Sequence, residues 1–365
     1  KPLARLDREG ARGCLADLAT AGLLSRQAAF VVLACADLSD PTCFLGQRGI
    51  ARAGAAGLGE VLRARTARDL IGATFAVPGR AVPTGYLRAL LRIGEGRESE
   101  LGRDALTDPE AYRRLWQIFT SEPQGAKAMA LRFCGRISAG TLVAIDTLDP
   151  VLIHPEILRH IATAERTAKA NALLRLLRTA VSSATDKTLT QALQASLGKG
   201  SALENFARKA VEQADVFPPP PLPPSATITP LTSAAALIAL GAEMGNCART
   251  KIGEVLLGLS YIYRAEHRAV DGTRTPLAIE LVPLSSGQWM VREIKGVKNR
   301  SPTPQALRAI LGRLHALGAV SPGSICTERT RELSSLLGVF RWNAFDFAAM
   351  ELDALEEVLE TREAA

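Results

Sequence analysis

The chain has 365 residues, of which 47% are hydrophobic and 22% charged, a composition of folded globular proteins that excludes wholesale disorder. Its net charge is +7, with 14 Lys and Arg against 9 Asp and Glu in residues 231–350, which favours a partner rich in phosphates. No apolar run is long enough to cross a bilayer, so we expect no membrane partner.

The six cysteines are scattered along the chain. They form no Cys-x-x-Cys pair and no Cys/His cluster at the spacing of zinc ligands. Such thiols are typical of reduced, mostly buried residues, so we expect a cytoplasmic protein without a structural zinc or a disulfide framework. The pattern identifies no cofactor, and Mg²⁺ is expected only if the protein is a nuclease.

Residues 1–215 are predicted to form a largely helical domain. Ala, Leu and Arg dominate this region, and apolar residues recur at spacings of three and four, as within residues 173–181. A helix is expected to begin at Pro109, and another after His154 and Pro155. No fixed repeat period is present, and we expect this domain to be the one that binds a protein partner, if the chain has one.

Residues 216–230 are rich in proline and separate this region from the rest of the chain. Consecutive prolines cannot continue a helix and favour the stiff polyproline II conformation. We therefore predict a semi-rigid spacer between two domains. A ligand for a proline-recognition partner is the alternative.

Residues 231–340 are predicted to form a small α/β module, which makes the whole chain an α+β protein. The predicted elements, in order, are helices at 233–240 and 242–259, strands at 259–264, 277–282 and 288–294, a helix at 304–317 and a short strand near 324–327. Turns are expected at Asp271-Gly272 and at residues 285–287, and Thr303 is expected to cap the helix that Gly318 ends. Terminal helices are expected from Glu328, and residues 341–365 form a C-terminal helix with an acidic tail.

The predicted helix 242–259 carries the first candidate site residues. Cys247, Lys251, Glu254 and Gly258 fall on one narrow stripe of this helix. A thiol, an amine and a carboxylate on one stripe are expected to line one side of an active site. The positive charge of Lys251 is then expected to lower the pKa of the Cys247 thiol. The alternative is a surface ion pair beside a half-buried cysteine.

The second and third predicted strands add Glu280 and the run Glu293-Ile294-Lys295. Trp289, Val291, Glu293 and Lys295 are expected to share one face of the third strand. The pattern resembles the acid and Glu-x-Lys arrangement of the PD-(D/E)XK nucleases. That resemblance implies Glu280 and Glu293 as ligands of Mg²⁺, Lys295 as the residue that activates water, and Glu254 as an additional acid. The alternative is that Glu280 pairs with Arg292 or Lys295 across the sheet.

A basic segment follows the third strand and leads into the next helix. Lys295, Lys298, Asn299 and Arg300 lie around a glycine in this segment. Backbone N–H groups at a helix start bind phosphate, and basic side chains beside them add the opposite charge. We therefore predict contact with the phosphates of DNA or RNA here.

Two tyrosines and one thiol are further candidates. Tyr261 and Tyr263 share one face of the first strand and are candidates for stacking on bases, with packing in the strand core as the alternative. Cys247 is a candidate nucleophile if His267 or His315 approaches it in space.

The same module resembles the PcfJ-like family, which is named after a protein encoded on a conjugative plasmid. Members show a His-Cys pair, a glycine before an aromatic strand, a strand glutamate and a Gln-x-(Arg/Lys)-Gly-x-x-Asn string. The residues that match are Cys247, Gly258, Glu280, Lys295, Gly296 and Asn299. Asn246 stands in place of the histidine and Glu293 in place of the glutamine. The resemblance covers roughly 60 residues, about 240–302, and implies an association with mobile elements.

The leading functional prediction is a nucleic-acid-binding accessory protein of a mobile genetic element or phage-related system. The first alternative is a Mg²⁺-dependent nuclease that uses Glu280, Glu293 and Lys295. The second is a non-catalytic protein-interaction scaffold.

Overall fold

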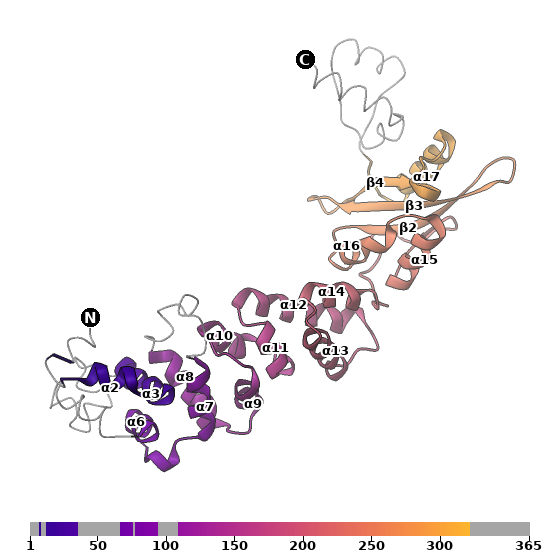
Figure 1. Cartoon of the computed structure of the whole chain (residues 1–365). Helices are drawn as coiled ribbons and strands as arrows, with labels where there is room; N and C mark the ends of the chain where they lie inside the picture. The colour runs from indigo at the N-terminus through magenta and orange to yellow at the C-terminus, as the bar shows by residue number, and fades with distance from the viewer. Residues whose placement is uncertain (1–6, 9–11, 36–65, 76, 94–108, 322–365) are drawn as a thin grey trace, which may run out of the picture. The chain divides into compact units, whose positions relative to one another are not determined.

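A computed structural model of the protein describes residues 7–8, 12–35, 66–75, 77–93 and 109–321 (Figure 1). The chain divides into two compact units, residues 1–174 with 186–203, and residues 175–185 with 204–365. The first is helical and the second contains a sheet, so the predicted α+β fold with a helical N-terminal part is confirmed. None of the helices in these described ranges is long and apolar enough to cross a membrane.

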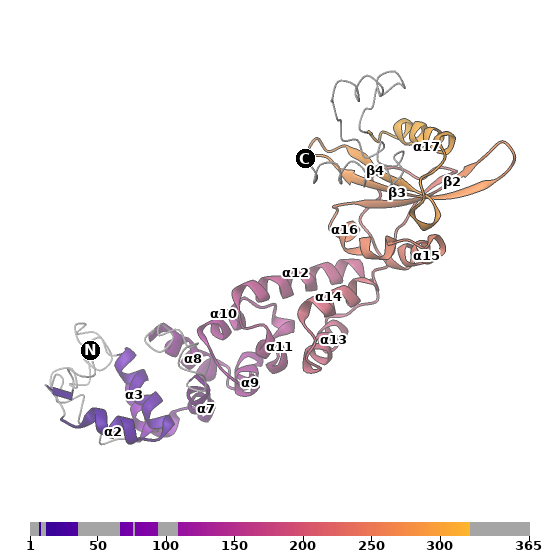
Figure 2. The same cartoon turned by 45° about the horizontal axis from the view of Figure 1, so that its top comes forward.

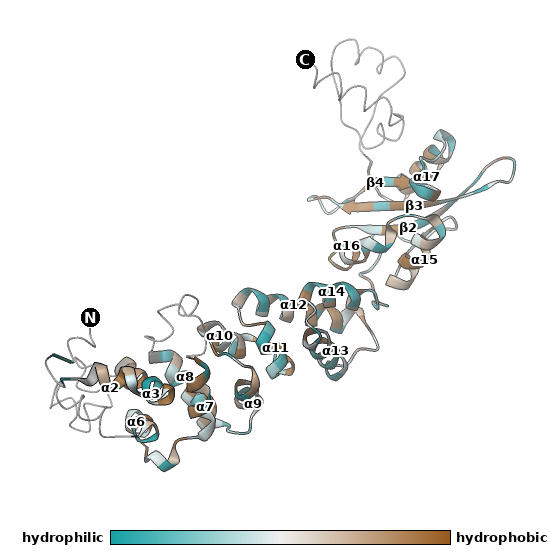
Figure 3. Cartoon of the chain, in the orientation of Figure 1, coloured by the Kyte–Doolittle hydropathy of each residue, from teal (hydrophilic) through white to brown (hydrophobic). Residues whose placement is uncertain are grey.

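The first unit is built from short amphipathic helices. These are α2 (Cys14–Thr20), α3 (Leu23–Cys35), α6 (Ala67–Thr74), α7 (Thr84–Ile93), α8 (Pro109–Ser121), α9 (Ala126–Phe133), α10 (Ala139–Thr147), α11 (Pro155–His160), the first part of α12 (Ala164–Ala180) and α13 (Asp186–Gly198), with 3-10 turns η2 (Gly79–Ala81) and η3 (Pro150–Leu152). Hydrophilic and hydrophobic segments alternate along α12 and α13 (Figure 3). In α8 the buried residues Tyr112, Leu115 and Phe119 recur at spacings of three and four, which is the reason that apolar spacing predicts such a helix.

Two expected helix starts are confirmed. α8 begins at Pro109, and its Tyr112, Leu115 and Phe119 are fully buried. α11 begins at Pro155, where the His154 ring nitrogen accepts a hydrogen bond from the Glu156 N–H at 3.2 Å. His154 therefore acts as a helix cap.

The second unit is built on a four-stranded antiparallel sheet in the order β1-β2-β3-β4. Its elements are α14 (Leu203–Val211), β1 (Ile228–Pro230), α15 (Ala234–Met244), η4 (Ala248–Lys251), α16 (Ile252–Leu256), β2 (Tyr261–Arg268), β3 (Arg274–Pro283), β4 (Trp289–Lys295), η5 (Val297–Asn299) and α17 (Pro304–Ala316). In both views α15 and α16 lie on one side of the strands and α17 on the other (Figures 1 and 2). The three predicted strands are present, joined by the two expected turns, in which Gly272 and Gly287 have φ of 86° and 83°.

The sheet has two chemically different faces. On the buried apolar face, Tyr263 of β2, Ile279 of β3 and Ile294 of β4 lie side by side across the three strands. On the opposite face, Ile262, Glu280 and Glu293 lie side by side in the same way. Acidic groups from two strands are thus brought together on one face.

A β-bulge in β4 overturns the expectation that Val291 and Glu293 share one face. Val291 pairs with Leu281, whereas Glu293 pairs with the adjacent Glu280, so Arg292 is an extra residue in β4. Val291 is fully buried, while Glu293 lies on the opposite face beside Glu280. The bulge therefore turns the Glu293 side chain to the sheet face that carries Glu280.

The continuous helix expected over 242–259 is wrong. α15 ends at Gly245, which takes the left-handed conformation with φ of 58°, and the Asn246 side chain accepts a hydrogen bond from the Ala248 N–H at 3.0 Å. A left-handed glycine followed by such an asparagine turn ends a helix and reverses the chain. Gly241, expected to separate two helices, lies inside α15, where the backbone of η4 packs closely against it.

Residues 216–230, expected to be a spacer between domains, pack into the core of the second unit instead. Phe217 and Leu222 are 7% and 4% exposed and belong to the core cluster of the sheet. The Tyr263 hydroxyl accepts a hydrogen bond from the Leu222 N–H at 2.8 Å and donates one to its carbonyl at 2.9 Å. Ile228 then begins β1, a strand too short to be predicted from its sequence.

α17 confirms the helix expected over 304–317. The Thr303 hydroxyl accepts a hydrogen bond from the Ala306 N–H at 3.3 Å, and Gly318 follows the helix with φ of 96°. Val320 then forms a parallel bridge with Met290 of β4. The strand expected near 324–327, the terminal helices and the acidic tail lie outside the described residues.

Candidate functional site

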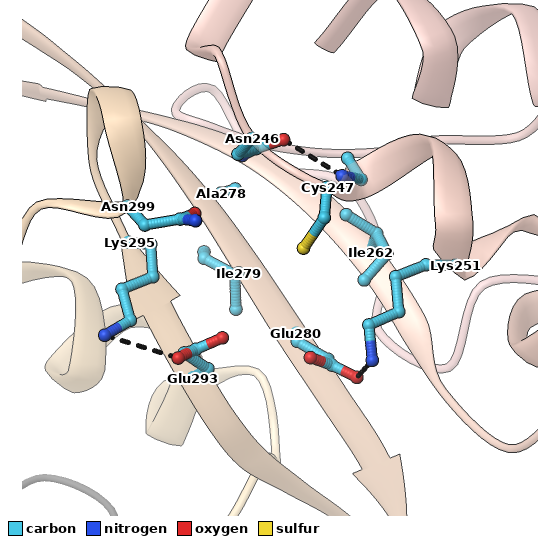
Figure 4. A pocket seen from close by; sticks show the side chains of 11 residues that line it. Asn246, Cys247, Lys251, Ile262, Ala278, Ile279, Glu280, Glu293, Lys295 and Asn299 are labelled. Carbon is cyan, nitrogen blue, oxygen red and sulfur yellow. Dashed lines mark hydrogen bonds and ion pairs between the residues drawn. The ribbon is translucent and has the colours of Figure 1, made fainter. Parts of the chain in front are cut away.

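A pocket opens on the sheet face that carries Glu280, between the η4 turn and the end of β4 (Figure 4). Its empty space is about 400 Å³ when the open solvent at its mouth is included. Its apolar lining comes from Ile262, from Ala278 and from Ile279, whose side chain belongs to the opposite, buried face of β3. Its polar lining is Asn246, Cys247, Lys251, Glu280, Glu293, Lys295 and Asn299. Three separate stretches of sequence therefore meet at one place.

Six of the predicted site residues lie in this lining. They are Cys247, Lys251, Glu280, Glu293, Lys295 and Asn299. Figure 4 shows Cys247 and Lys251 on one side of the pocket and Lys295 and Asn299 on the other, with β3 between them. Glu254, Lys298, Arg300, Tyr261 and Tyr263 are not among the lining residues.

Glu280 is a buried carboxylate with two cationic partners. The residue is 8% exposed, and its Oε1 lies 3.1 Å from Nζ of Lys251 and 3.3 Å from Nη1 of Arg292. A carboxylate at such a position needs compensating partners because burial removes its hydration. The expected alternative that Glu280 pairs with Arg292 is therefore confirmed, and Lys251 is a second partner.

Lys251 lies between two carboxylates. Its Nζ is 3.1 Å from both carboxylate oxygens of Glu254 as well as from Oε1 of Glu280. Burial alone lowers the pKa of Lys251, but hydrogen bonds and charge attraction from Glu254 and Glu280 together outweigh it and raise the pKa above its ordinary value. Lys251 is thus a charged structural partner, and its ammonium is paired with carboxylates rather than committed to the Cys247 thiol.

Glu293 and Lys295 form a second, more open pair. Their charged groups lie 3.3 Å apart, with the side chains 51% and 27% exposed. An exposed pair of this kind contributes little to stability because water and salt screen it. Glu293 is therefore the carboxylate of the pocket that remains accessible to a ligand.

The segment 295–300 is held in one conformation. The Gly296 N–H donates to the Arg300 carbonyl at 2.8 Å, and the Arg300 N–H donates to the Val297 carbonyl at 3.2 Å. Lys298 and Asn299 both take the left-handed conformation, with φ of 56° and 58°. This turn places the Asn299 side chain in the pocket lining while Lys298 and Arg300 stay exposed.

Tyr261 and Tyr263 are not available for stacking on bases, and the alternative, that they pack in the core of the strand, is confirmed. They are 2% and 0% exposed, because both point into the core, where their rings lie 5.3 Å apart. Burial raises the pKa of Tyr261 to about 12 and that of Tyr263 further. Neither ring is accessible to a base.

The expected helical stripe of Cys247, Lys251, Glu254 and Gly258 does not exist as one face. Cys247 precedes the 3-10 turn, and Gly258 follows α16 in a left-handed turn with φ of 69°. Cys247 remains an exposed thiol that lines the pocket.

No histidine among the described residues is placed to activate Cys247. His267 is 8% exposed and lies on the opposite face of β2, five residues from Ile262, or roughly 16 Å along the strand. His315 hydrogen-bonds to Ser321 at 2.8 Å. The geometry thus gives no support to a thiol nucleophile.

The donor set fits a Mg²⁺ ion poorly. Among the described residues no three His, Cys, Asp or Glu side chains gather in one group that could hold a metal. Glu280 and Glu293 are neighbours in register, but Glu280 is already paired with Lys251 and Arg292. Two cations beside the buried carboxylate repel a further cation.

Arg292 and Lys251 are the partners that the expected two-carboxylate site did not include. The bulge that brings Arg292 to Glu280 has no direct sequence signal. The chain reversal that brings Lys251 there has one, because Gly245-Asn246 is a typical helix end.

Comparison of the chain with protein-family models, curated proteins and solved structures finds no match.

Proposed function

We propose that the second unit binds the sugar–phosphate backbone of a nucleic acid, DNA or RNA, through Lys298 and Arg300, with Lys295 at the edge of the pocket. One observation carries the proposal. Lys298 and Arg300 are exposed, and neither has an ion-pair partner within the described part of the chain. Unpaired cations of this kind are free to replace the counterions of phosphates.

Two other exposed arginines of the same unit, Arg249 and Arg264, are paired with carboxylates. Arg249 meets Glu212 through two nitrogens at 2.8–3.1 Å, and Arg264 meets Glu243 at 2.8 Å. A phosphate that approaches these arginines has to displace a carboxylate. It meets no such competitor at Lys298 and Arg300, so these two side chains are the better phosphate ligands.

The fixed conformation of the segment 295–300 also supports the proposal. The hydrogen bonds from the Gly296 N–H to the Arg300 carbonyl and from the Arg300 N–H to the Val297 carbonyl hold the turn. The Lys298 stem lies beside Gly245, where a Cβ would be 3.6 Å from Cγ of Lys298. Because the backbone is already ordered, binding a phosphate orders side chains only, which lowers the entropic cost of association.

We further propose that the protein is a PcfJ-like accessory protein of a mobile genetic element or phage-related system. The support is that four of the residues that carry this resemblance, Cys247, Glu280, Lys295 and Asn299, come from distant parts of the module and line one pocket. Residues that match a family pattern and also converge in space favour a shared site.

Salt dependence of binding tests the proposal. The full chain is titrated into a fluorescent single-stranded oligonucleotide and into a duplex at several salt concentrations. We expect the logarithm of the binding constant to fall linearly with the logarithm of salt concentration. A flat response, or no binding, contradicts the proposal and favours a protein-interaction scaffold.

The nuclease reading has a separate test. Its one favourable observation is that Glu280, Glu293 and Lys295 lie on one sheet face. Plasmid and single-stranded substrates are incubated with wild type and Glu293→Ala, with and without Mg²⁺. We expect no cleavage that depends on Glu293, and cleavage lost in Glu293→Ala would favour the nuclease instead.

A further inference from the structure

The pocket and its edge differ in charge. Two basic and two acidic side chains belong to the lining, and these are Lys251, Lys295, Glu280 and Glu293. Their charges cancel, so the interior has no net attraction for a phosphate. The unpaired cations Lys298 and Arg300 lie outside the lining. Phosphate is therefore favoured at the edge and disfavoured inside.

The interior instead offers the chemistry of a nucleobase site. The floor holds apolar atoms of Ile262 and Ala278, against which the flat face of a base can lie. The amides of Asn246 and Asn299 and the accessible carboxylate of Glu293 line the walls. Amides pair with base edges, and a carboxylate accepts hydrogen bonds from exocyclic amino groups.

We infer that the pocket receives one unpaired nucleobase, and that the second unit therefore binds single-stranded nucleic acid in preference to a double helix. The inference rests on the backbone binding proposed above and adds the class of substrate. The sugar–phosphate chain leaves the pocket toward Lys298 and Arg300, while the base lies on the floor. A base held in a stacked, paired duplex cannot enter a concave site without being extruded.

The burial of the two tyrosines also favours this arrangement. Single-strand binding surfaces commonly stack successive bases on exposed aromatic rings. Tyr261 and Tyr263 are in the core, so this sheet has no such platform on β2. The pocket floor is the surface on which a base can be removed from water instead.

Cys247 supplies a natural reporter for the test. Its thiol is exposed and lines the pocket, so a base on the floor shields it from alkylating reagents. The full chain is treated with N-ethylmaleimide, and the modification of Cys247 is followed by peptide mass spectrometry. Three ligands are added in separate reactions: a mixed-sequence single-stranded oligonucleotide, an abasic oligonucleotide of the same length, and the duplex. Each is used as DNA and, where it can be synthesised, as RNA.

We expect the base-containing single strand to slow Cys247 modification at least fivefold at saturation, and the abasic strand to leave it unchanged although it binds. The DNA and RNA arms then show which sugar the site accepts. Equal protection by the abasic strand, or stronger protection by the duplex, overturns the inference while the backbone binding stands. If no strand binds with a salt response, the proposed function itself fails.

A matched pair of variants gives an independent readout. Cys247→Phe adds a bulky ring to the pocket lining, whereas Leu257→Phe adds the same ring at a residue that is 65% exposed and outside the lining. We expect Cys247→Phe to weaken binding of the base-containing strand about tenfold and to leave the abasic strand unaffected. Leu257→Phe should bind both as wild type does. An unchanged affinity of folded Cys247→Phe for the base-containing strand contradicts the inference.

Discussion

The ammonium of Lys251 lies 3.1 Å from Oε1 of Glu280, a carboxylate that is 8% exposed. The contact joins the turn after α15 to the middle of the sheet, so it fixes one wall of the pocket to its floor. Arg292, which lies in the bulge of β4, is the second cation that compensates the buried charge of Glu280. The pair is therefore a structural element of the site.

Removal of Lys251 is expected to destabilise the protein. In Lys251→Met the buried Glu280 keeps Arg292 as its partner but loses the closer cation. Loss of one partner of a buried charge costs several kcal/mol when nothing remains, so we expect about 2 kcal/mol here. Urea unfolding of wild type and variant measures the difference.

Arg264→Met is the control for this change. Arg264 pairs with Glu243 at 2.8 Å, but the two side chains are 46% and 42% exposed. An exposed pair contributes roughly 0.5 kcal/mol or less. Equal losses in Lys251→Met and Arg264→Met would show that Glu280 does not depend on Lys251.

Stability is expected to fall at alkaline pH. The pKa of Lys251 is raised by its carboxylate partners, against the effect of burial, and burial raises that of Tyr261 to about 12. Both groups hold their protons more tightly in the folded protein. The stability that they contribute is therefore fully present below about pH 10, near their pKa values in the unfolded chain. It is lost as the pH rises through their pKa values in the folded protein.

The urea midpoint should accordingly be level from pH 8 to about 9.5 and fall above about pH 10. In Tyr261→Phe the fall should be shallower, because one buried proton-binding group is removed. A fall in Tyr261→Phe as steep as that of wild type contradicts the assignment.

The two buried tyrosines should differ in their response to loss of the hydroxyl. Tyr263→Phe leaves the N–H and the carbonyl of Leu222 without a partner in the core and should cost roughly 1–3 kcal/mol. The Tyr261 hydroxyl is buried without a hydrogen-bond partner among the described residues, so Tyr261→Phe should cost under about 0.5 kcal/mol at neutral pH. Equal costs in thermal unfolding would contradict the packing of the proline-rich segment.

The chain reversal at Gly245 should tolerate only glycine. Gly245→Ala keeps the left-handed φ of 58° and should cost roughly 1 kcal/mol, because a Cβ there is strained. Gly253→Ala is the control, since Gly253 lies in α16 with no atom within 4 Å of its Cβ position. It should be neutral or stabilising, and a loss equal to that of Gly245→Ala would count against the reversal.

Much of the fold follows from the sequence, since apolar spacing and turn residues predict helices, strands and their order. α17 is an example, because Thr303 predicts its start, its apolar face predicts its extent and Gly318 predicts its end. The helix at 242–259 fails because its apolar spacing continues across Gly245, while one backbone angle at this residue reverses the chain. The spacing of apolar residues alone does not reveal a single residue in the left-handed conformation.

The candidate site was predictable in its residues and not in its arrangement. Glu280, Glu293 and Lys295 were found because their pattern resembles the acid and Glu-x-Lys arrangement of the PD-(D/E)XK nucleases. The bulge at Arg292 depends on how two strands pair over their whole length, so it has no local signal. The buried state of Tyr261 and Tyr263 depends likewise on the proline-rich segment and the helices that cover them.

The most direct test of the account compares two double variants in their salt response on a single-stranded oligonucleotide. Lys298→Ala/Arg300→Ala removes two unpaired cations, and Arg249→Ala/Arg264→Ala removes two paired ones. Each lost phosphate contact to a single strand should reduce the slope of log K against log salt by about 0.7. We predict a slope shallower by roughly 1.4 in the first double variant and an unchanged slope in the second. Equal slopes in the first variant and wild type would contradict the account.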